Sequence, residues 1–188
     1  MFKAIKPIVL VFLPLAALAL LLSACGEEAE VLPSGPTGTP YIIGSTAAGP
    51  NTHGAGGANV FTTPITVPND TYVVGVGVYL KTAGLDWTLG IYDDNAGVAN
   101  ALLASGGLIT SIDGDNSVNV TPTFLAAGNY WLAQENTTGA SFSYYAETVT
   151  GTVSWMNLTA GDPMPTSYTE SGVNTVGFAP SAYLIARD

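Results

Sequence analysis

Residues 71–92 read TYVVGVGVYLKTAGLDWTLGIY, two runs of alternating apolar residues with a short turn between them. One face of the first run is aliphatic and consists of Val74, Val76, Val78 and Leu80. The opposite face carries Gly75, Gly77, Tyr79 and Lys81. In the second run, Trp87, Leu89 and Ile91 alternate with polar residues or glycine. Since successive side chains of a strand point to opposite faces, both runs predict strands with one buried face, and Trp87 is expected in the core.

The same two-residue period recurs along the rest of the chain. Further strand-like runs are residues 128–134, 141–147, 149–155 and 181–187. Clusters of Gly, Pro, Asn and Asp separate them, as at Pro68-Asn69-Asp70 and Gly161-Asp162-Pro163. Many short strands with regular turn signals predict an all-β fold, a single antiparallel β-sandwich. The best helix candidate is residues 96–104, which we expect to be short because it contains Gly and Asn.

The densest pattern lies between Trp87 and Ala133. It contains LGIYDD at residues 89–94, LLAS at 102–105 and LAAGNYWLA at 125–133. This pattern resembles a jelly-roll or lectin-like β-sandwich module that is found in bacterial secreted proteins and phage tail proteins. Where those modules carry Pro-Gly, this sequence has Ala99-Asn100. The resemblance implies a jelly-roll-like sandwich and says little about function, because sandwiches host many unrelated functions.

The first 25 residues have the pattern of an export signal. Lys3 and Lys6 precede an apolar run from Ile8 to Leu22, which is short for a membrane span and typical of a signal peptide. The run ends in Leu22-Ser23-Ala24-Cys25, which resembles the lipobox of bacterial lipoproteins. That resemblance implies cleavage after residue 24 and lipidation of Cys25, the one cysteine of the chain. An ordinary signal peptide or a short membrane anchor is the alternative.

The segment after Cys25 is expected to be a tether. Residues 26–40 read GEEAEVLPSGPTGTP, which offers little apolar surface to bury. We therefore expect a signal peptide at 1–24, a lipidated cysteine and flexible linker at 25–40, and one β-sandwich domain at 41–188. Gly26, and not Asp, follows the cysteine in this sequence. The resemblance to lipoproteins therefore implies the outer membrane or the cell surface.

Composition excludes several classes of partner and site. The chain has 4 Lys and Arg against 14 Asp and Glu, and without residues 1–24 only Lys81 and Arg187 remain. So acidic a protein is not expected to bind nucleic acid, since phosphate contacts need basic side chains. One cysteine and one histidine exclude an intramolecular disulfide and a His-rich metal site.

Catalytic patterns are weak. No G-x-S-x-G motif occurs, and His53 lies in the glycine-rich stretch 51–57, where we expect a flexible loop. A pair of carboxylates could hydrolyse a glycoside, and the candidates are Asp86, Asp93, Asp94, Asp113, Asp115, Glu135 and Glu147. A domain with this many acids contains some such pair by chance, so we expect no enzyme.

Calcium is the one cofactor that the sequence suggests. Oxygen ligands cluster at Asp93-Asp94 and again at Asp113, Asp115 and Asn116. The alternative is that these residues simply make turns, for which Asp, Asn and Gly are common.

Aromatic residues are the remaining candidates for a binding site. Sugar-binding sandwiches stack sugar rings on exposed Trp or Tyr. The candidates here are Tyr92, Trp131, Tyr144, Tyr145 and Trp155. Burial in the core is the competing interpretation for each of them.

The sequence thus favours a lipid-anchored, cell-surface, non-catalytic binding module, lectin-like or adhesive. Its partners would be the membrane, through the lipid, and a glycan or surface protein. The second hypothesis is a structural or assembly subunit of an envelope complex or surface appendage, which would join its partners by strand addition. The third is a small glycoside hydrolase.

Overall fold

A computed structural model describes residues 36–148, 153–174 and 178–188. The signal peptide, Cys25 and residues 26–35 of the expected tether lie outside the described residues. Every regular element in the described part is a strand. Within those ranges, no helix has the length and apolar character needed to cross a membrane.

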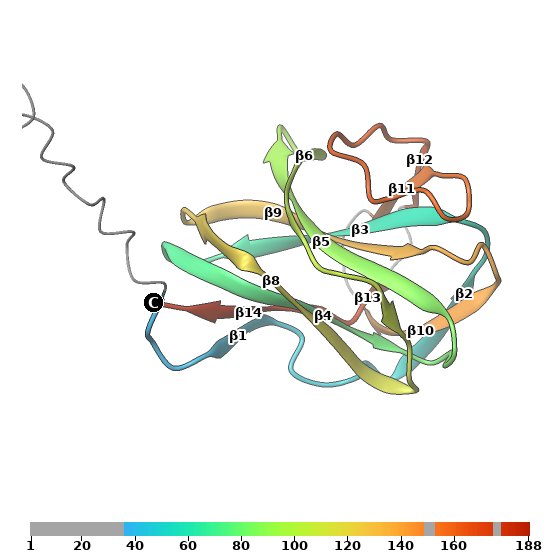
Figure 1. The fold of residues 1–188 in the computed structure, drawn as a ribbon, viewed down its shortest axis with the longest axis horizontal. Coiled ribbons are helices and arrows are strands. Elements are labelled where there is room, and N and C mark those ends of the chain that lie inside the picture. The colour runs from blue at the N-terminus through green and yellow to red at the C-terminus, as the bar shows by residue number, and fades with distance from the viewer. Residues whose placement is uncertain (1–35, 149–152, 175–177) are drawn as a thin grey trace, which may run out of the picture. The chain divides into compact units, whose positions relative to one another are not determined.

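Two antiparallel sheets make up the fold (Figure 1). Sheet A runs in the order β1 (Tyr41–Gly44), β14 (Ala182–Arg187), β4 (Thr71–Leu80), β10 (Phe142–Thr148) and β13 (Phe178–Pro180). Two further strands join it, since β2 (Asn51–Ala55) pairs with β10 and β8 (Gly114–Leu125) pairs with β4.

Sheet B runs in the order β12 (Gly172–Asn174), β11 (Val153–Asn157), β3 (Asn59–Val67), β9 (Gly128–Asn136), β5 (Asp86–Asn95) and β6 (Val98–Ser105). The short β7 (Ile109–Thr110) also pairs with β5. The described residues therefore form the β-sandwich that the sequence predicts.

The main core lies between the sheets, and Trp87 is fully buried in it, as expected. On β4 the core residues are Val73, Val76, Val78 and Leu80. The expected position of Val74 is wrong, because the register of β4 against β8 shifts between Val73 and Gly75. Such a bulge adds one residue to the strand and moves every later side chain to the other face.

A two-residue hairpin joins β5 to β6, so the helix expected at residues 96–104 is wrong. Asn95 pairs with Val98, and the two residues between them, Ala96 and Gly97, have φ angles of 55° and 87°. Positive φ at both positions is the signature of a type I′ turn, whose twist matches that of the flanking strands. The turn converts the segment into strand.

His53 does not lie in a flexible loop. It belongs to β2 and pairs with Tyr144 of β10, and its ring centre is 4.2 Å from that of Phe178. The glycine-rich composition of residues 51–57 suggested a loop, but pairing with β10 holds the segment extended. His53 is thus a packed strand residue.

The outer face of sheet B is covered by residues 158–171, here called the strap. Met164 and Tyr168 of the strap pack with Tyr92 and Trp131 in a second apolar cluster. The cluster is separate from the main core because Tyr92 and Trp131 alternate with the core residues Ile91 and Leu132. Sheet B is therefore buried on both faces where the strap lies.

Candidate binding face

The outer face of sheet A carries a band of aromatic side chains from four strands. Its members are Tyr72 and Tyr79 of β4, Phe124 of β8, Tyr145 of β10 and Tyr183 of β14. Each of them precedes or follows a core residue in its strand, as Tyr79 does between Val78 and Leu80. The period of two therefore directs all five rings away from the core.

Glycine makes room for one of these rings. A Cβ on Gly77 would lie 2.1 Å from Cζ of Tyr183, so the ring occupies the space above the glycine. Tyr183 donates a hydrogen bond from its hydroxyl to Asp115 (2.5 Å), and its ring centre is 5.8 Å from that of Tyr79. Burial, together with Asp115, raises the pKa of Tyr183 well above its ordinary value. The tyrosine therefore stays a neutral donor to the carboxylate.

Lys81, Asp113 and Tyr145 form a polar triad on the same face. Lys81 donates to Asp113 (2.7 Å) and to the Tyr145 hydroxyl (3.1 Å), and that hydroxyl donates to Asp113 (2.9 Å). The hydrogen bonds from Lys81 and then Tyr145 lower the pKa of Asp113, and those to Asp113 and Tyr145 raise the pKa of Lys81 to about 12. The triad is charged at neutral pH and about half exposed to solvent, so the charge pair adds little stability.

A shallow basin lies beside the triad. Its volume is about 470 Å³, and its lining is Gly54, Ala55, Gly56, Thr82, Ser141, Phe142 and Ser143. Gly54 of β2 pairs with Ser143 of β10, two residues before Tyr145 on the same face. The basin therefore offers hydroxyl groups on a floor of small residues, with an aromatic ring and a charged pair next to it.

The opposite end of the aromatic band is apolar and exposed. The Tyr72 and Phe124 rings meet edge to face with centres 5.5 Å apart, and Phe124 is 54% exposed. Ile42 of β1 adds to the exposed apolar residues of this face. The band thus changes from apolar at Phe124 to polar at the basin.

The predicted calcium ligands fall into two separate places. Asp93 and Asp94 lie on β5 in sheet B, whereas Asp113 and Asp115 lie at the start of β8 in sheet A. In the described part of the chain, no group of three or more His, Cys, Asp or Glu residues could hold a metal ion. The two loops therefore do not combine into one site.

Each of these residues also has protein partners of its own. Asp93 accepts from the Ala101 amide, and Asp94 accepts from the Gly97 amide and from Trp131 Nε1 (2.7 Å). Asn116 is buried and bonds to the backbone of Ile112 and Gly114. These are the contacts of turn residues, and calcium binding stays a prediction.

Three of the five candidate aromatic residues are buried in the structure, which is the competing interpretation given for them above. Tyr92 and Trp131 lie under the strap, and Tyr144 lies in the main core. Trp155 is half-buried, and its ring lies so close to Gly172 that a Cβ there would be 2.4 Å from it. Of the five, only Tyr145 belongs to the aromatic band on sheet A.

Sequence reasoning missed most of the band. The alternation of residues 74–81 already placed Tyr79 and Lys81 opposite the aliphatic core face. That alternation is the signal from which these two residues of the face could have been predicted. Tyr72 and Phe124 face each other across β4 and β8. That pairing joins residues far apart in the sequence, and no local pattern announces it.

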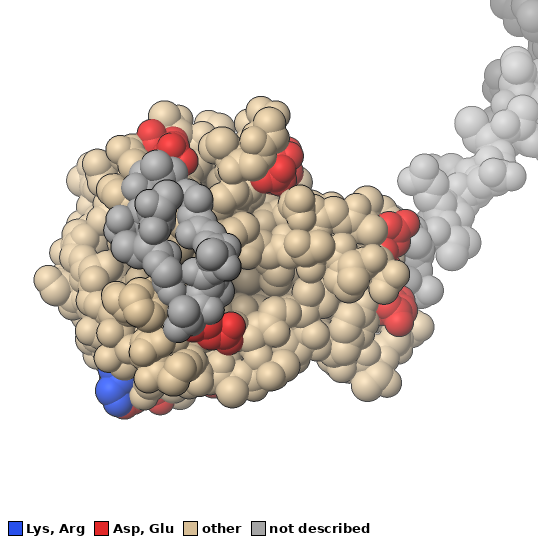
Figure 2. Space-filling model, turned by 180° about the vertical axis from the view of Figure 1, so that it is seen from behind, with Lys and Arg blue, Asp and Glu red and all other residues tan. Residues whose placement is uncertain are grey.

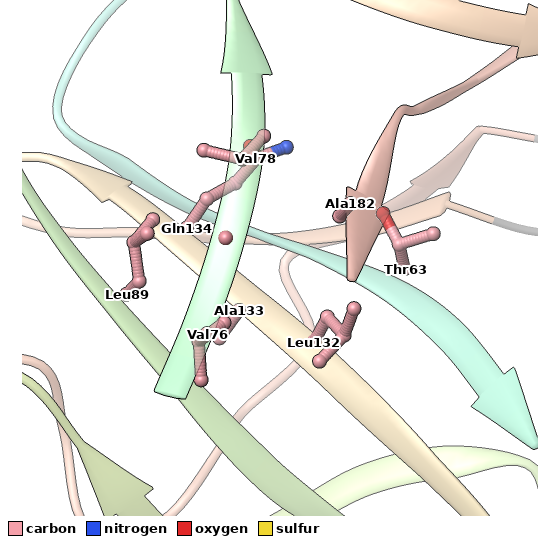
Figure 3. A pocket seen from close by; sticks show the side chains of 9 residues that line it. Thr63, Val76, Val78, Leu89, Leu132, Ala133, Gln134 and Ala182 are labelled. Atoms are coloured by element: carbon pink, nitrogen blue, oxygen red, sulfur yellow. The ribbon is translucent and has the colours of Figure 1, made fainter. Parts of the chain in front are cut away.

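One cavity in the sandwich interior has a volume of about 10 Å³ (Figure 3). Leu89, Leu132, Val76 and Val78 line it, together with Gln134, whose side-chain oxygen has no hydrogen-bond partner among the described residues. A volume of this size is at the lower limit for a single water molecule. The cavity is therefore too small for an organic ligand.

On the face seen from behind the view of Figure 1, the charged side chains are scattered rather than clustered (Figure 2). Acidic side chains lie apart from one another, and most of the surface in this view is uncharged. This view shows no extended basic surface.

Comparison with known proteins gives a likeness of fold. No protein-family model matches the chain, and no curated protein matches it. Among solved structures, the chain is similar to the cysteine protease and lectin-like domains of Cwp84, a surface layer associated protein of Clostridium difficile. The TM-score is 0.50 at 12% identity, and the match covers 79% of this chain and 36% of that one. At this identity the comparison supports the sandwich fold and nothing finer.

Proposed function

We propose that this protein is a lipid-anchored, non-catalytic binding module of the bacterial cell surface that recognises a glycan on the outer face of sheet A. The observation that carries the proposal is the hydroxyl-lined basin next to the triad of Lys81, Asp113 and Tyr145. A sugar presents many hydroxyl groups together with apolar ring faces. The basin and triad offer donors, acceptors and one aromatic ring within a single shallow surface.

Other observations support the same proposal. The similar solved structure includes a lectin-like domain of a surface-associated protein. The lipobox-like sequence at residues 22–25 supports export and anchoring. The acidic chain is suited to an uncharged ligand better than to an anionic one.

A glycan array with the full chain in detergent tests the proposal. Tyr145→Ala removes the ring and one member of the triad, and we expect it to weaken glycan binding roughly tenfold or more, since such contacts contribute about 1–3 kcal/mol. Tyr72→Ala is the matched control, because it removes an exposed tyrosine at the apolar end of the same band. No reproducible binding to any glycan, or equal losses in both variants, would contradict the proposal.

The array should be run with calcium and with a chelator. Binding that disappears with the chelator would support the calcium hypothesis for Asp113 and Asp115. Binding that persists would leave the glycan proposal in place without the metal.

A role in assembly is the second candidate, and strand β8 favours it. This strand is twelve residues long and pairs with β4 alone among the described strands. Phe124 near its end is exposed, and Ile112 just before it is 60% exposed. An extended partner strand could add to this edge, although Pro122 within β8 interrupts its hydrogen-bonding groups. Light scattering of the full chain, followed by pull-down of envelope proteins, tests this role.

Glycoside hydrolysis is the third candidate. Glu135 has a pKa raised to about 7, as a general acid requires, but it is fully buried beneath the strap. A hydrolase assay on the glycans that bind would test this candidate directly.

A further inference from the structure

Glu135 is a carboxylic acid enclosed in sheet B. Its side chain lies on the outer face of β9, in line with Trp131 and Ala133, and it is 0% exposed. Neither carboxylate oxygen has a hydrogen-bond partner among the described residues. Burying an ionised carboxylate without a partner costs several kcal/mol, so this environment favours the neutral acid.

The strap is the cover over this face. It is tied to the sheet along its edges, where the amides of Leu158, Gly161 and Ser171 bond to carbonyls of Ala58, Thr137 and Trp155. On the β6 side, Leu102 donates to Thr166 and Tyr168 donates to Asn100. Tyr92 reaches up from β5 and donates to the Pro165 carbonyl (2.6 Å). The two backbone bonds on the β6 side flank an antiparallel bridge between Ala101 and Ser167, and Met164 and Tyr168 pack in the second cluster. The strap has no longer ladder of backbone hydrogen bonds, so its local opening requires less free energy than opening of the central sheet.

The charged and titratable groups around Glu135 do not neutralise it. On the strap these groups are Asp162 and, farther along, Tyr168 and Glu170. On β5 the group is Tyr92, while Asp86 turns to the hydroxyl of Thr110. The neighbouring strands β3 and β11 present only uncharged side chains on this face, namely Val60, Thr62, Ser154 and Met156. The negative charge of Asp162 would repel an ionised Glu135, so it also favours the neutral form of Glu135.

We propose that Glu135 and the strap form a pH-sensitive switch, in which the neutral acid permits the closed strap and its ionisation favours opening. Burial, followed by the charge of Asp162, raises the pKa of Glu135 to about 7 in the closed state. In the open state water would solvate the carboxylate and return the pKa toward its ordinary value. Opening therefore becomes easier as the pH rises from about 5 to about 7.

Opening would uncover a surface that is absent from the closed protein. Tyr92 and Trp131 would become accessible next to an ionised carboxylate. Aromatic rings beside a negative charge are side chains that bind uncharged rings or organic cations. The switch lies in sheet B and the basin in sheet A, so the switch stands whether or not the glycan proposal holds.

Hydrogen exchange of the full chain in detergent tests the switch. After correction for intrinsic exchange, we expect the protection of strap amides to fall roughly tenfold or more between pH 5.5 and pH 8.0. The amides of β14 in the central part of sheet A serve as the internal reference and should not change. Unchanged strap protection across this range would overturn the proposal.

Two variants assign the effect to Glu135. Glu135→Gln keeps the shape and removes the ionisation, so its strap protection should not depend on pH. Glu147→Gln is the control, because it removes a half-buried glutamate from the other sheet and should behave as the native chain does. The same fall in Glu135→Gln as in the native chain would overturn the proposal.

If Glu135→Gln does not fold, a carbon-13 titration of the native carboxyl group decides. A midpoint near 7 is the expected result, and a midpoint near the ordinary value of 4.5 would overturn the proposal.

Discussion

Gly77 shows how one missing side chain shapes the candidate binding face. The absence of a Cβ at this position leaves the space that the Tyr183 ring occupies, and the hydroxyl of that ring donates to Asp115. Alternation in the sequence predicted that Gly77 faces away from the core. It could not predict what lies above the glycine, because Tyr183 comes from a strand more than a hundred residues later.

Gly77→Ala tests this contact. The new methyl group must displace the Tyr183 ring and weaken its bond to Asp115, so we expect a loss of about 1–3 kcal/mol in the free energy of unfolding. Urea denaturation measures it. Gly107→Ala is the control, because a Cβ there meets no atom within 4 Å. Equal stability of the two variants would contradict the packing role of Gly77.

Glu135 gives a second test at the level of one residue. Its pKa is raised from 4.5 to about 7 in the folded protein, so the folded state binds the proton more tightly than the unfolded state does. The contribution of Glu135 to stability is therefore fully present at low pH and falls as the pH rises through this interval, by about 3 kcal/mol when fully expressed. Glu135→Gln should remove this dependence. Urea denaturation of both proteins at pH 5 and pH 8 measures the change in the free energy of unfolding with pH. An equal change in the native chain and in Glu135→Gln would contradict the prediction.

At the scale of elements, the period of two predicted β4, β5, β9, β10, β14 and the described part of residues 149–155 in β11, but not the long strands β3, β6 and β8. On β9 the same period puts neighbouring side chains on opposite faces, with Tyr130 against the main core and Trp131 in the second cluster. Alternation identifies two faces but does not say whether the outer face is covered. The strap has no such period, so its position over Tyr92 and Trp131 could not be read from the sequence.

The hairpin between β5 and β6 was missed for a related reason. Its turn places Ala96 at a positive φ angle, a backbone conformation that residues other than Asn, Asp and Gly rarely adopt. Asp94 offsets this cost, since it accepts hydrogen bonds from the Gly97 amide and from Trp131 Nε1. The turn is therefore stabilised by a contact to β9, which a local reading of residues 93–97 does not contain.

Asp94→Ala tests whether this loop is a turn or a calcium site. Removal of the carboxylate leaves the Trp131 Nε1 group buried without its acceptor, and we expect a loss of about 1–3 kcal/mol in stability. If Asp94 acts only in the turn, thermal melting of the native chain will be the same in millimolar calcium and in chelator. A rise in the melting midpoint with calcium that disappears in Asp94→Ala would instead establish a calcium site at this loop.

At the scale of the whole molecule, the sandwich carries the candidate binding face, and the proposed lipid on Cys25 would provide the attachment. The two sheets bury a core without any disulfide, so the one cysteine is free for another role. Cys25 stands at the position of the lipobox-like sequence where lipidation requires a thiol. An acidic domain is repelled by anionic headgroups, and a covalent lipid on Cys25 would hold it at a membrane.

Cys25→Ser tests the anchor in the native host. Two or more acyl chains give stable membrane attachment, so loss of the thiol should move the protein out of the membrane fraction or leave it unprocessed. Fractionation and intact mass spectrometry measure both effects. Ser34→Ala, outside the four lipobox positions, should remain in the membrane fraction with the mass of a lipidated chain. Unchanged fractionation and mass in Cys25→Ser would refute lipidation, and would do so without touching the basin, since the face on sheet A is built entirely from residues after Tyr41.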